Sequence, residues 1–252
     1  MKDIGLALGG GAVLGAAHIG AIRAMGESDI KVNHIAGTSI GALVATLYAF
    51  NKDWQEMKNI ASELNWIDIS KLALSRYGLL SNDRLGDLII EHIGDKHIED
   101  AHIPLALVAT DVSNGKKVVL KKGSVAEAVM ASTSIPGIFK PVEIDGQMLV
   151  DGGVAENVPV ETVRDMSDHY VVGVDLNSQH THGKPDNVLD VILNSFHFLM
   201  QKSDRLQTKN ADLLIKPDLS AFNMSDMSQT DELVKQGYEE SKKILKEYNQ
   251  NF

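Results

Sequence analysis

Ser39 has the sequence surroundings of a catalytic nucleophile. Segment 37–41 reads Gly-Thr-Ser-Ile-Gly, between a short apolar run and an apolar stretch of helical pattern. In a nucleophile elbow the serine occupies a strained turn between a strand and a helix, and Gly37 and Gly41 leave room for neighbouring backbone. The helix that follows directs the positive end of its dipole at the serine oxygen. The pattern also fits a tight turn with an incidental serine, but the flanking strand and helix favour a nucleophile.

A glycine-rich loop precedes Ser39 and joins another strand-like run to a helix. Residues 9–15 read Gly-Gly-Gly-Ala-Val-Leu-Gly. A dinucleotide-binding loop needs the spacing GxGxxG, and its third glycine position, counted from Gly9, falls on Leu14. A phosphate-binding loop needs a final Gly-Lys-Ser or Gly-Lys-Thr, which is missing. Consecutive glycines also let backbone N–H groups approach a developing alkoxide. The loop therefore predicts an oxyanion hole, with a turn needed only for packing as the alternative.

The proton acceptor for Ser39 has two kinds of candidate, histidine and carboxylate. The histidines that follow Asp151 in the chain, as α/β-hydrolase order requires, are His169, His180, His182 and His197. None of them has a distinctive sequence setting. Asp151 comes directly after the apolar run 148–150 and before Gly152 and Gly153, which open the backbone around it. An ordinary Asp-Gly turn explains this motif in isolation, but together with the other two motifs it indicates a carboxylate base.

The elements that must position these residues follow from the hydrophobic pattern. Strand, turn and helix occur twice within the first 50 residues, which predicts βαβ units and a parallel sheet. Asn114-Gly115 and Asp145-Gly146 suit the positive φ angles of tight hairpin turns. Strands are expected at 4–8, 34–36, 103–110, 116–121, 142–144, 147–150, 170–176 and 213–215. Residues 53–100, 188–209 and 231–248 are expected to be mostly helical, and 177–187 to be a loop.

Composition and charge limit the classes of partner. The chain has 24 Lys and Arg against 34 Asp and Glu, a net charge of −10, and no cysteine. An acidic chain without a basic cluster is not expected to bind nucleic acid. Disulfides and thiolate chemistry are excluded, and the five-residue spacing of His92, His97 and His102 argues against a metal site on one helix face. No long uncharged apolar run occurs, so we expect a cytoplasmic protein.

Four motifs in order resemble the patatin-like phospholipase family, in particular its bacterial members. They lie at 9–20, 35–44, 131–139 and 149–159, the last including Leu-Val-Asp-Gly-Gly and Asn-Val-Pro. The resemblance covers about residues 4–165. It implies a three-layer α/β/α sandwich with a mixed, mainly parallel sheet that continues to about residue 176. Residues 187–252 are then a C-terminal helical extension packed on the same domain.

The resemblance also implies the chemistry, which is hydrolysis of acyl esters of lipids by a Ser–Asp dyad without cofactor or metal. Ser39 would be the nucleophile and Asp151 the general base, with the backbone N–H groups of Gly10, Gly11 and Ala12 as the oxyanion hole. The supporting motif glycines are Gly9, Gly15, Gly37, Gly41, Gly152 and Gly153. The partner is a lipid or acyl ester, with transient membrane-surface contact.

One departure from the family pattern keeps other functions open. Members of the family usually carry Arg or Lys where this chain has Leu14, and a glycine where it has Ala12. Backbone donors survive both changes, but recognition of a phosphate head group is expected to weaken. The alternatives are a lipid-binding regulatory protein of weak activity and a Ser-His-Asp hydrolase. The apolar stretch 188–209 is expected to be a packed helix, or else the wall of an acyl pocket or an interfacial surface.

Overall fold

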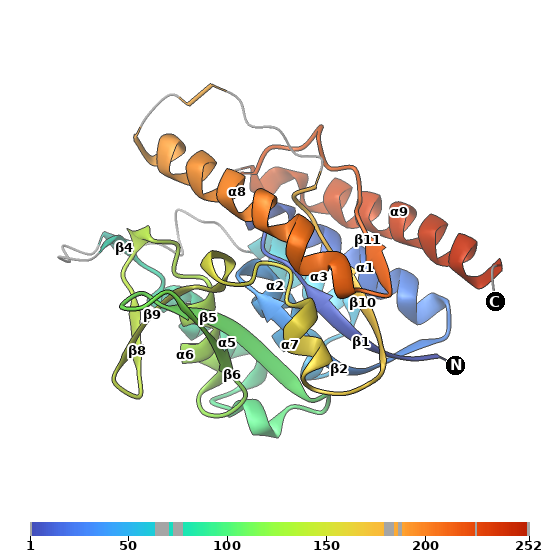
Figure 1. Ribbon diagram of the computed structural model, residues 1–252, viewed down its shortest axis with the longest axis horizontal. Coiled ribbons are helices and arrows are strands. Elements are labelled where there is room, and N and C mark those ends of the chain that lie inside the picture. The colour runs from blue at the N-terminus through green and yellow to red at the C-terminus, as the bar shows by residue number, and fades with distance from the viewer. Residues whose placement is uncertain are drawn as a thin grey trace.

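The computed structural model describes residues 2–63, 71–72, 78–178, 184–185, 188–224 and 226–250 (Figure 1). Its main sheet has the strand order β11-β10-β1-β2-β5-β9-β8, and β6 also pairs with β5. The parallel strands are β1 (Lys2–Leu8), β2 (Ile30–Thr38), β5 (Leu105–Asp111), β10 (Tyr170–Val174) and β11 (Leu213–Ile215). The antiparallel strands are β6 (Lys116–Leu120), β8 (Val142–Ile144) and β9 (Gln147–Asp151). The predicted mixed, mainly parallel sheet is confirmed.

Helices cover both faces of this sheet (Figure 1). The larger layer contains α1 (Ala16–Glu27), α2 (Ile40–Ala49), α3 (Trp54–Glu63), α5 (Asp83–Ile93), α6 (Val125–Ser132) and α9 (Thr230–Gln250), with the main hydrophobic core beneath it. On the opposite face α7 (Val160–Arg164) packs through Val160 and Val163 on small residues such as Ala7 and Ala36. The three-layer sandwich is thus confirmed, with one thick and one thin helical layer.

The last helix but one, α8 (Val188–Gln207), lies across the carboxyl ends of β9 and β10. It contacts the 3₁₀ helix η3 (Gly152–Val154), which follows β9, and Gln201 Nε2 donates to the carbonyl of Asn177 beyond β10. Besides the helices α8 and α9, the segment after residue 187 contains the strand β11, which belongs to the main sheet. Among the described residues, no helix is both long and apolar enough to cross a membrane.

Two expectations about local structure are corrected. Residues 53–100 are less helical than predicted, because β4 (Gly78–Ser81) pairs with β3 (Lys71–Leu72) and with the distant β7 (Gly137–Phe139) in a small second sheet.

Of the two predicted hairpin turns, one has the expected geometry and one does not. Asp145 and Gly146 have φ of 51° and 75°, as the predicted two-residue turn requires. At Asn114-Gly115 only Gly115 has a positive φ. The N–H groups of Asn114 and Gly115 both donate to Asp111 O, so the turn is longer than the predicted two residues. The antiparallel pairs themselves are as predicted.

Helices α1 and α9 pack with their backbones in contact, because glycines face each other across the interface. A Cβ atom at Gly20 would lie 2.1 Å from Val234 O and 2.4 Å from the backbone N of Tyr238. A Cβ atom at Gly237 would lie 2.1 Å from Ala17 O. At the edge of this interface the Arg23 guanidinium stacks on the ring of Tyr238 at 4.2 Å. The interface therefore has no room for a side chain at either glycine.

Candidate active site

Ser39 forms the turn between β2 and α2. Its φ of 55° and ψ of −127° place it in a region that residues other than glycine rarely adopt. A Cβ atom at Gly37 would lie 2.3 Å from Gly41 O, and one at Gly41 would lie 2.3 Å from Leu8 O. The elbow therefore requires both glycines, as the sequence predicts. The side chain of Ser39 is half-buried and points to the carboxyl edge of the sheet.

Asp151 meets Ser39 at this edge, at the end of β9. Ser39 Oγ donates to Asp151 Oδ2 over 2.7 Å, although the two residues are 112 positions apart. The other carboxylate oxygen, Oδ1, accepts from the N–H of Gly153 over 2.8 Å. Gly152, which directly follows Asp151, is also required, since a Cβ atom there would lie 2.2 Å from Val108 O. The pairing of β9 with β5, which neighbours β2, brings the two side chains together.

The charge state of Asp151 is set by burial. The side chain is fully buried, and desolvation raises the pKa of its carboxyl to about 7, against the lowering effect of the bonds from Ser39 and Gly153. A carboxylate with a pKa in this range accepts a proton far more readily than one in water. Asp151 is therefore suited to act as a base near neutral pH.

This pKa predicts the pH dependence of any reaction that uses Asp151 as a base. We expect kcat/KM for an uncharged ester to fall below the pKa of about 7 and to level off above it, because only the ionised carboxylate takes the Ser39 proton. Initial rates with p-nitrophenyl butyrate across about pH 5 to 9 measure this dependence. A rate that stays constant down to about pH 5 would exclude a base with this pKa.

The glycine loop lies beside Ser39. A Cβ atom at Gly10 would lie 3.1 Å from Ser39 Cβ, and one at Gly15 would lie 2.2 Å from Ile40 Cγ1. Gly9 donates its N–H to Val174 O, and Gly10 donates to Asn157 Oδ1 over 3.1 Å. In the described part of the chain, the N–H groups of Gly11 and Ala12 donate to no acceptor. These two N–H groups are available to an oxyanion, whereas that of Gly10 is already engaged.

Sequence reasoning missed several residues that hold the loop and the elbow. Ser132 Oγ accepts the N–H of Ser39 over 2.9 Å and donates to Val108 O. The ring of His18 lies with Nε2 2.7 Å from Gly9 O, and burial lowers its pKa to about 4, so it is neutral and donates through Nε2. The only sequence signal for these roles is that Ser132 and His18 fall inside the recognised motifs.

A buried chain of polar groups joins the loop to α8. Asn157 accepts from Gly10 and donates its Nδ2 to Asp204 Oδ2 over 3.0 Å. Burial, and to a lesser degree the charge of nearby Asp175, raises the pKa of Asp204 to about 8. Asn177 Nδ2 donates to Gly10 O, so the peptide groups on both sides of Gly10 are fixed. Asp204 gave no sequence signal, because its partner is 47 residues away.

Among the residues that the structure describes, Asp151 and not a histidine accepts the hydrogen bond of Ser39 Oγ. His34 and His169 share the hydroxyl of Ser167 at 2.8 and 2.6 Å, away from Ser39. His197 is buried on α8 beside the Phe196 ring. His180 and His182 lie outside the described residues. Among the described residues, the side-chain partner of Ser39 Oγ is Asp151, and no group of three potential metal ligands occurs.

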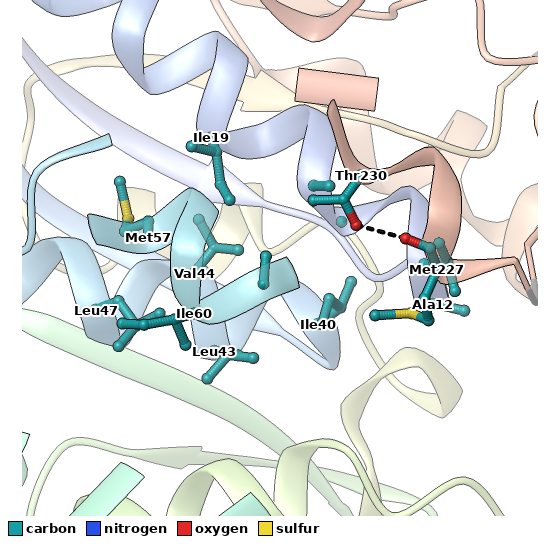
Figure 2. Close-up of a pocket in the computed structure, with 14 residues that line it drawn as sticks. Ala12, Ile19, Ile40, Leu43, Val44, Leu47, Met57, Ile60, Met227 and Thr230 are labelled. Atoms are coloured by element: carbon teal, nitrogen blue, oxygen red, sulfur yellow. Dashed lines mark hydrogen bonds between the residues drawn. The ribbon is translucent and has the colours of Figure 1, made fainter. Parts of the chain in front are cut away.

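An apolar pocket begins beside the loop and the elbow (Figure 2). It runs between α1, α2 and α3 toward the start of α9, and Ala12 and Ile40 form the end near Ser39. In this conformation its volume is about 30 Å³. Met57 and Met227 line it, and methionine side chains readily adapt to a ligand. Leu14, which stands where the resemblance implies a basic residue in most members of the family, is fully buried in the core.

Comparison with known proteins identifies the family and supports the fold. Residues 6–164 match the model of the patatin-like phospholipase family. An uncharacterised NTE family protein of Mycobacterium tuberculosis is 34% identical over 177 residues, which cover 69% of this chain and 49% of that protein. A lysophospholipase NTE1 of Mycosarcoma maydis is 33% identical over 182 residues, covering 70% of this chain and 10% of that protein. The chain thus spans about half or less of these relatives.

The fold also has a counterpart among solved structures. VipD from Legionella pneumophila matches 98% of this chain and 67% of its own chain, with a TM-score of 0.63 and 15% sequence identity. The two described layers of helices around a mixed sheet therefore recur at very low sequence identity. The match of the family model to well over half of the residues, together with these relatives, shows that the chain belongs to the patatin-like phospholipase family.

Proposed function

We propose that this chain hydrolyses carboxylic esters of lipids through an acyl-Ser39 intermediate. The observation that carries the proposal is the 2.7 Å hydrogen bond from the half-buried hydroxyl of Ser39 to the buried carboxylate of Asp151. Membership of the patatin-like phospholipase family and a relative named as a lysophospholipase support a lipid ester as the substrate. The expected cytoplasmic location stays a prediction.

The proposed reaction has two halves. Ser39 Oγ attacks the ester carbonyl carbon while its proton passes to Asp151, and collapse of the tetrahedral intermediate breaks the bond to the alcohol, which leaves with that proton. Water then gives a proton to Asp151 and attacks the acyl carbon. The bond to Ser39 Oγ breaks, the carboxylic acid is released, and Ser39 recovers its proton from Asp151.

Backbone groups would stabilise the oxyanion of each tetrahedral intermediate. The N–H groups of Gly11 and Ala12 suit this role because neither donates to an acceptor in the described part of the chain. Gly10, also predicted as a donor, takes part only if its bond to Asn157 opens. The apolar pocket that begins at Ala12 and Ile40 suits an acyl group and provides no charge that would bind a phosphate there.

An alkyl fluorophosphonate tests the nucleophile directly. We expect intact-mass spectrometry to show one covalent adduct on the wild type and none on Ser39→Ala, because only an activated serine displaces fluoride. Ser195→Ala is a matched control, since Ser195 is an exposed serine on α8 that donates to Val191 O. An unreactive, folded wild type, or an adduct that persists in Ser39→Ala, would contradict the proposed function.

A further inference from the structure

Exposed apolar side chains concentrate on α8. Among the described residues, the large apolar side chains exposed to solvent include Val188, Val191, Phe198, Leu199 and Leu206 of this helix. Val188, Leu199 and Leu206 are 74%, 68% and 67% exposed. The neighbouring Val154 of η3, three residues after Asp151, is also half exposed. A concentration of this kind on one helix is a common mark of an interaction surface.

These side chains form one face of α8, which we call the outer face. At 100° per residue, positions 188, 191, 195, 199, 202 and 206 fall within about one third of a turn. The opposite face is attached to the rest of the protein, since Met200 and Asp204 are buried and Gln207 Nε2 donates to Ala155 O. The apolar outer face is therefore held in its outward orientation by the contacts of the inner face.

The charge of the outer face differs from that of the whole protein. Lys202 on the outer face and Arg205 beside it are exposed, whereas Asp204 is buried against Asn157. The chain as a whole carries a net charge of −10. An anionic lipid surface would repel most of the molecule and attract this end of α8. The interfacial zone of a bilayer has charged head groups next to acyl chains. Two basic side chains beside a row of apolar ones are suited to bind there.

The inner face of α8 lies against the candidate active site. A Cβ atom at Gly153 would lie 2.3 Å from Met200 Sδ, and Gly153 itself donates to Asp151. Gln201 holds Asn177, which donates to Gly10 O. α8, the orange helix of Figure 1, contacts η3, which directly follows Asp151. A surface that receives the outer face would lie one helix diameter from the dyad, about 10 Å.

We propose that the outer face of α8 docks on the surface of a lipid aggregate and so presents the site to substrate within it. This inference rests on the proposed function, because it takes the lipid ester as the substrate. Lys202 and Arg205 contact anionic head groups, while Val188, Val191, Leu199 and Leu206 enter the interfacial layer. Docking affects only access to substrate within a lipid aggregate, so the rate of hydrolysis of a dissolved ester does not depend on it.

The experiment compares two charge insertions in the full chain. Val188→Glu/Leu199→Glu places carboxylates on the outer face, and Ile90→Glu/Val112→Glu places them at exposed apolar positions on α5 and after β5. Binding is measured by co-sedimentation with vesicles of phosphatidylcholine and phosphatidylglycerol. Activity is measured on dissolved p-nitrophenyl butyrate and on lysophospholipid carried in the same vesicles.

We expect the outer-face variant to lose about tenfold or more in vesicle binding and in vesicle-borne turnover, while it keeps its rate on the dissolved ester. The control variant should match the wild type in all three assays. Equal loss in both variants, or a wild type that does not bind vesicles, overturns the docking surface. So does a wild-type dimer that the outer-face variant dissociates, because the face then binds a second copy. A wild type inactive on the dissolved ester contradicts the proposed function, whatever the vesicle result.

Discussion

Replacing Asp151 by Asn is expected to lower kcat for ester hydrolysis by about 10²–10⁴-fold. An amide has nearly the shape of a carboxylate but does not accept the proton of Ser39, so the elbow keeps its geometry while the proposed base is lost. The measurement is kcat on p-nitrophenyl butyrate, with circular dichroism to confirm the fold. Replacement of His197 or His169 should leave kcat near the wild-type value. If one histidine variant were folded and inactive and Asp151→Asn active, a conventional triad would replace the dyad.

The same substitution has a second consequence, for stability. Burial raises the folded-state pKa of Asp151 from 3.8 to about 7. The folded state therefore favours the protonated carboxyl. The contribution of this carboxyl to the free energy of unfolding is fully present below about pH 4 and is lost as the pH rises through about 7. Asparagine carries no charge to bury. Asp151→Asn should thus have a higher melting temperature than the wild type at about pH 8, and the difference should shrink toward pH 5.

Gly20→Ala is expected to destabilise the protein by about 3 kcal/mol or more. The new methyl group would lie 2.1 Å from Val234 O and 2.4 Å from the backbone N of Tyr238. Both neighbours are helical backbone of α9, which cannot move aside as a flexible side chain does. Either α9 shifts away from α1 along the interface, or the helices separate. Urea unfolding followed by circular dichroism measures the change in free energy.

Gly26→Ala is the matched control in the same helix. A Cβ atom at Gly26 meets nothing within 4 Å, and alanine has the better helix propensity. This variant should therefore be as stable as the wild type or more stable by about 0.5–1 kcal/mol. Similar free energies of unfolding for Gly20→Ala and Gly26→Ala would show that α1 and α9 do not pack as closely as described.

Local chemistry explains which parts of the site could be predicted from the sequence. The elbow at Ser39 is specified within five residues, because the turn itself requires Gly37 and Gly41. Asp151 can be predicted because a carboxylate that follows an apolar strand and precedes two glycines occurs in the same chain as the other two motifs. That it meets Ser39 depends on strand pairing, which no single motif encodes. The hydrogen bond between them agrees with the predicted pair, and its catalytic role stays a prediction.

The features that the sequence did not reveal depend on contacts between distant segments. β4 is a short apolar run whose strand conformation comes from pairing with β7, some 60 residues later. The turn at Asn114-Gly115 has a suitable dipeptide, yet the register of β5 and β6 leaves four residues between the strands. Asp204 looks like an ordinary polar residue of an amphipathic helix, and only the packing of α8 places it against Asn157.

The position of β1 inside the sheet has a consequence for protein synthesis. β1 is synthesised before both of its neighbours, β2 and β10, and the N–H of Gly9 just after it donates to Val174 O at the end of β10. Asp151 also belongs to the second half of the chain. A nascent chain that has released Ser39 but neither Asp151 nor β10 therefore carries the serine without its predicted base and without an anchored glycine loop. The contact between Ser39 and Asp151 can form only after β9 has been translated, and the glycine loop can be anchored only after β10 has been translated.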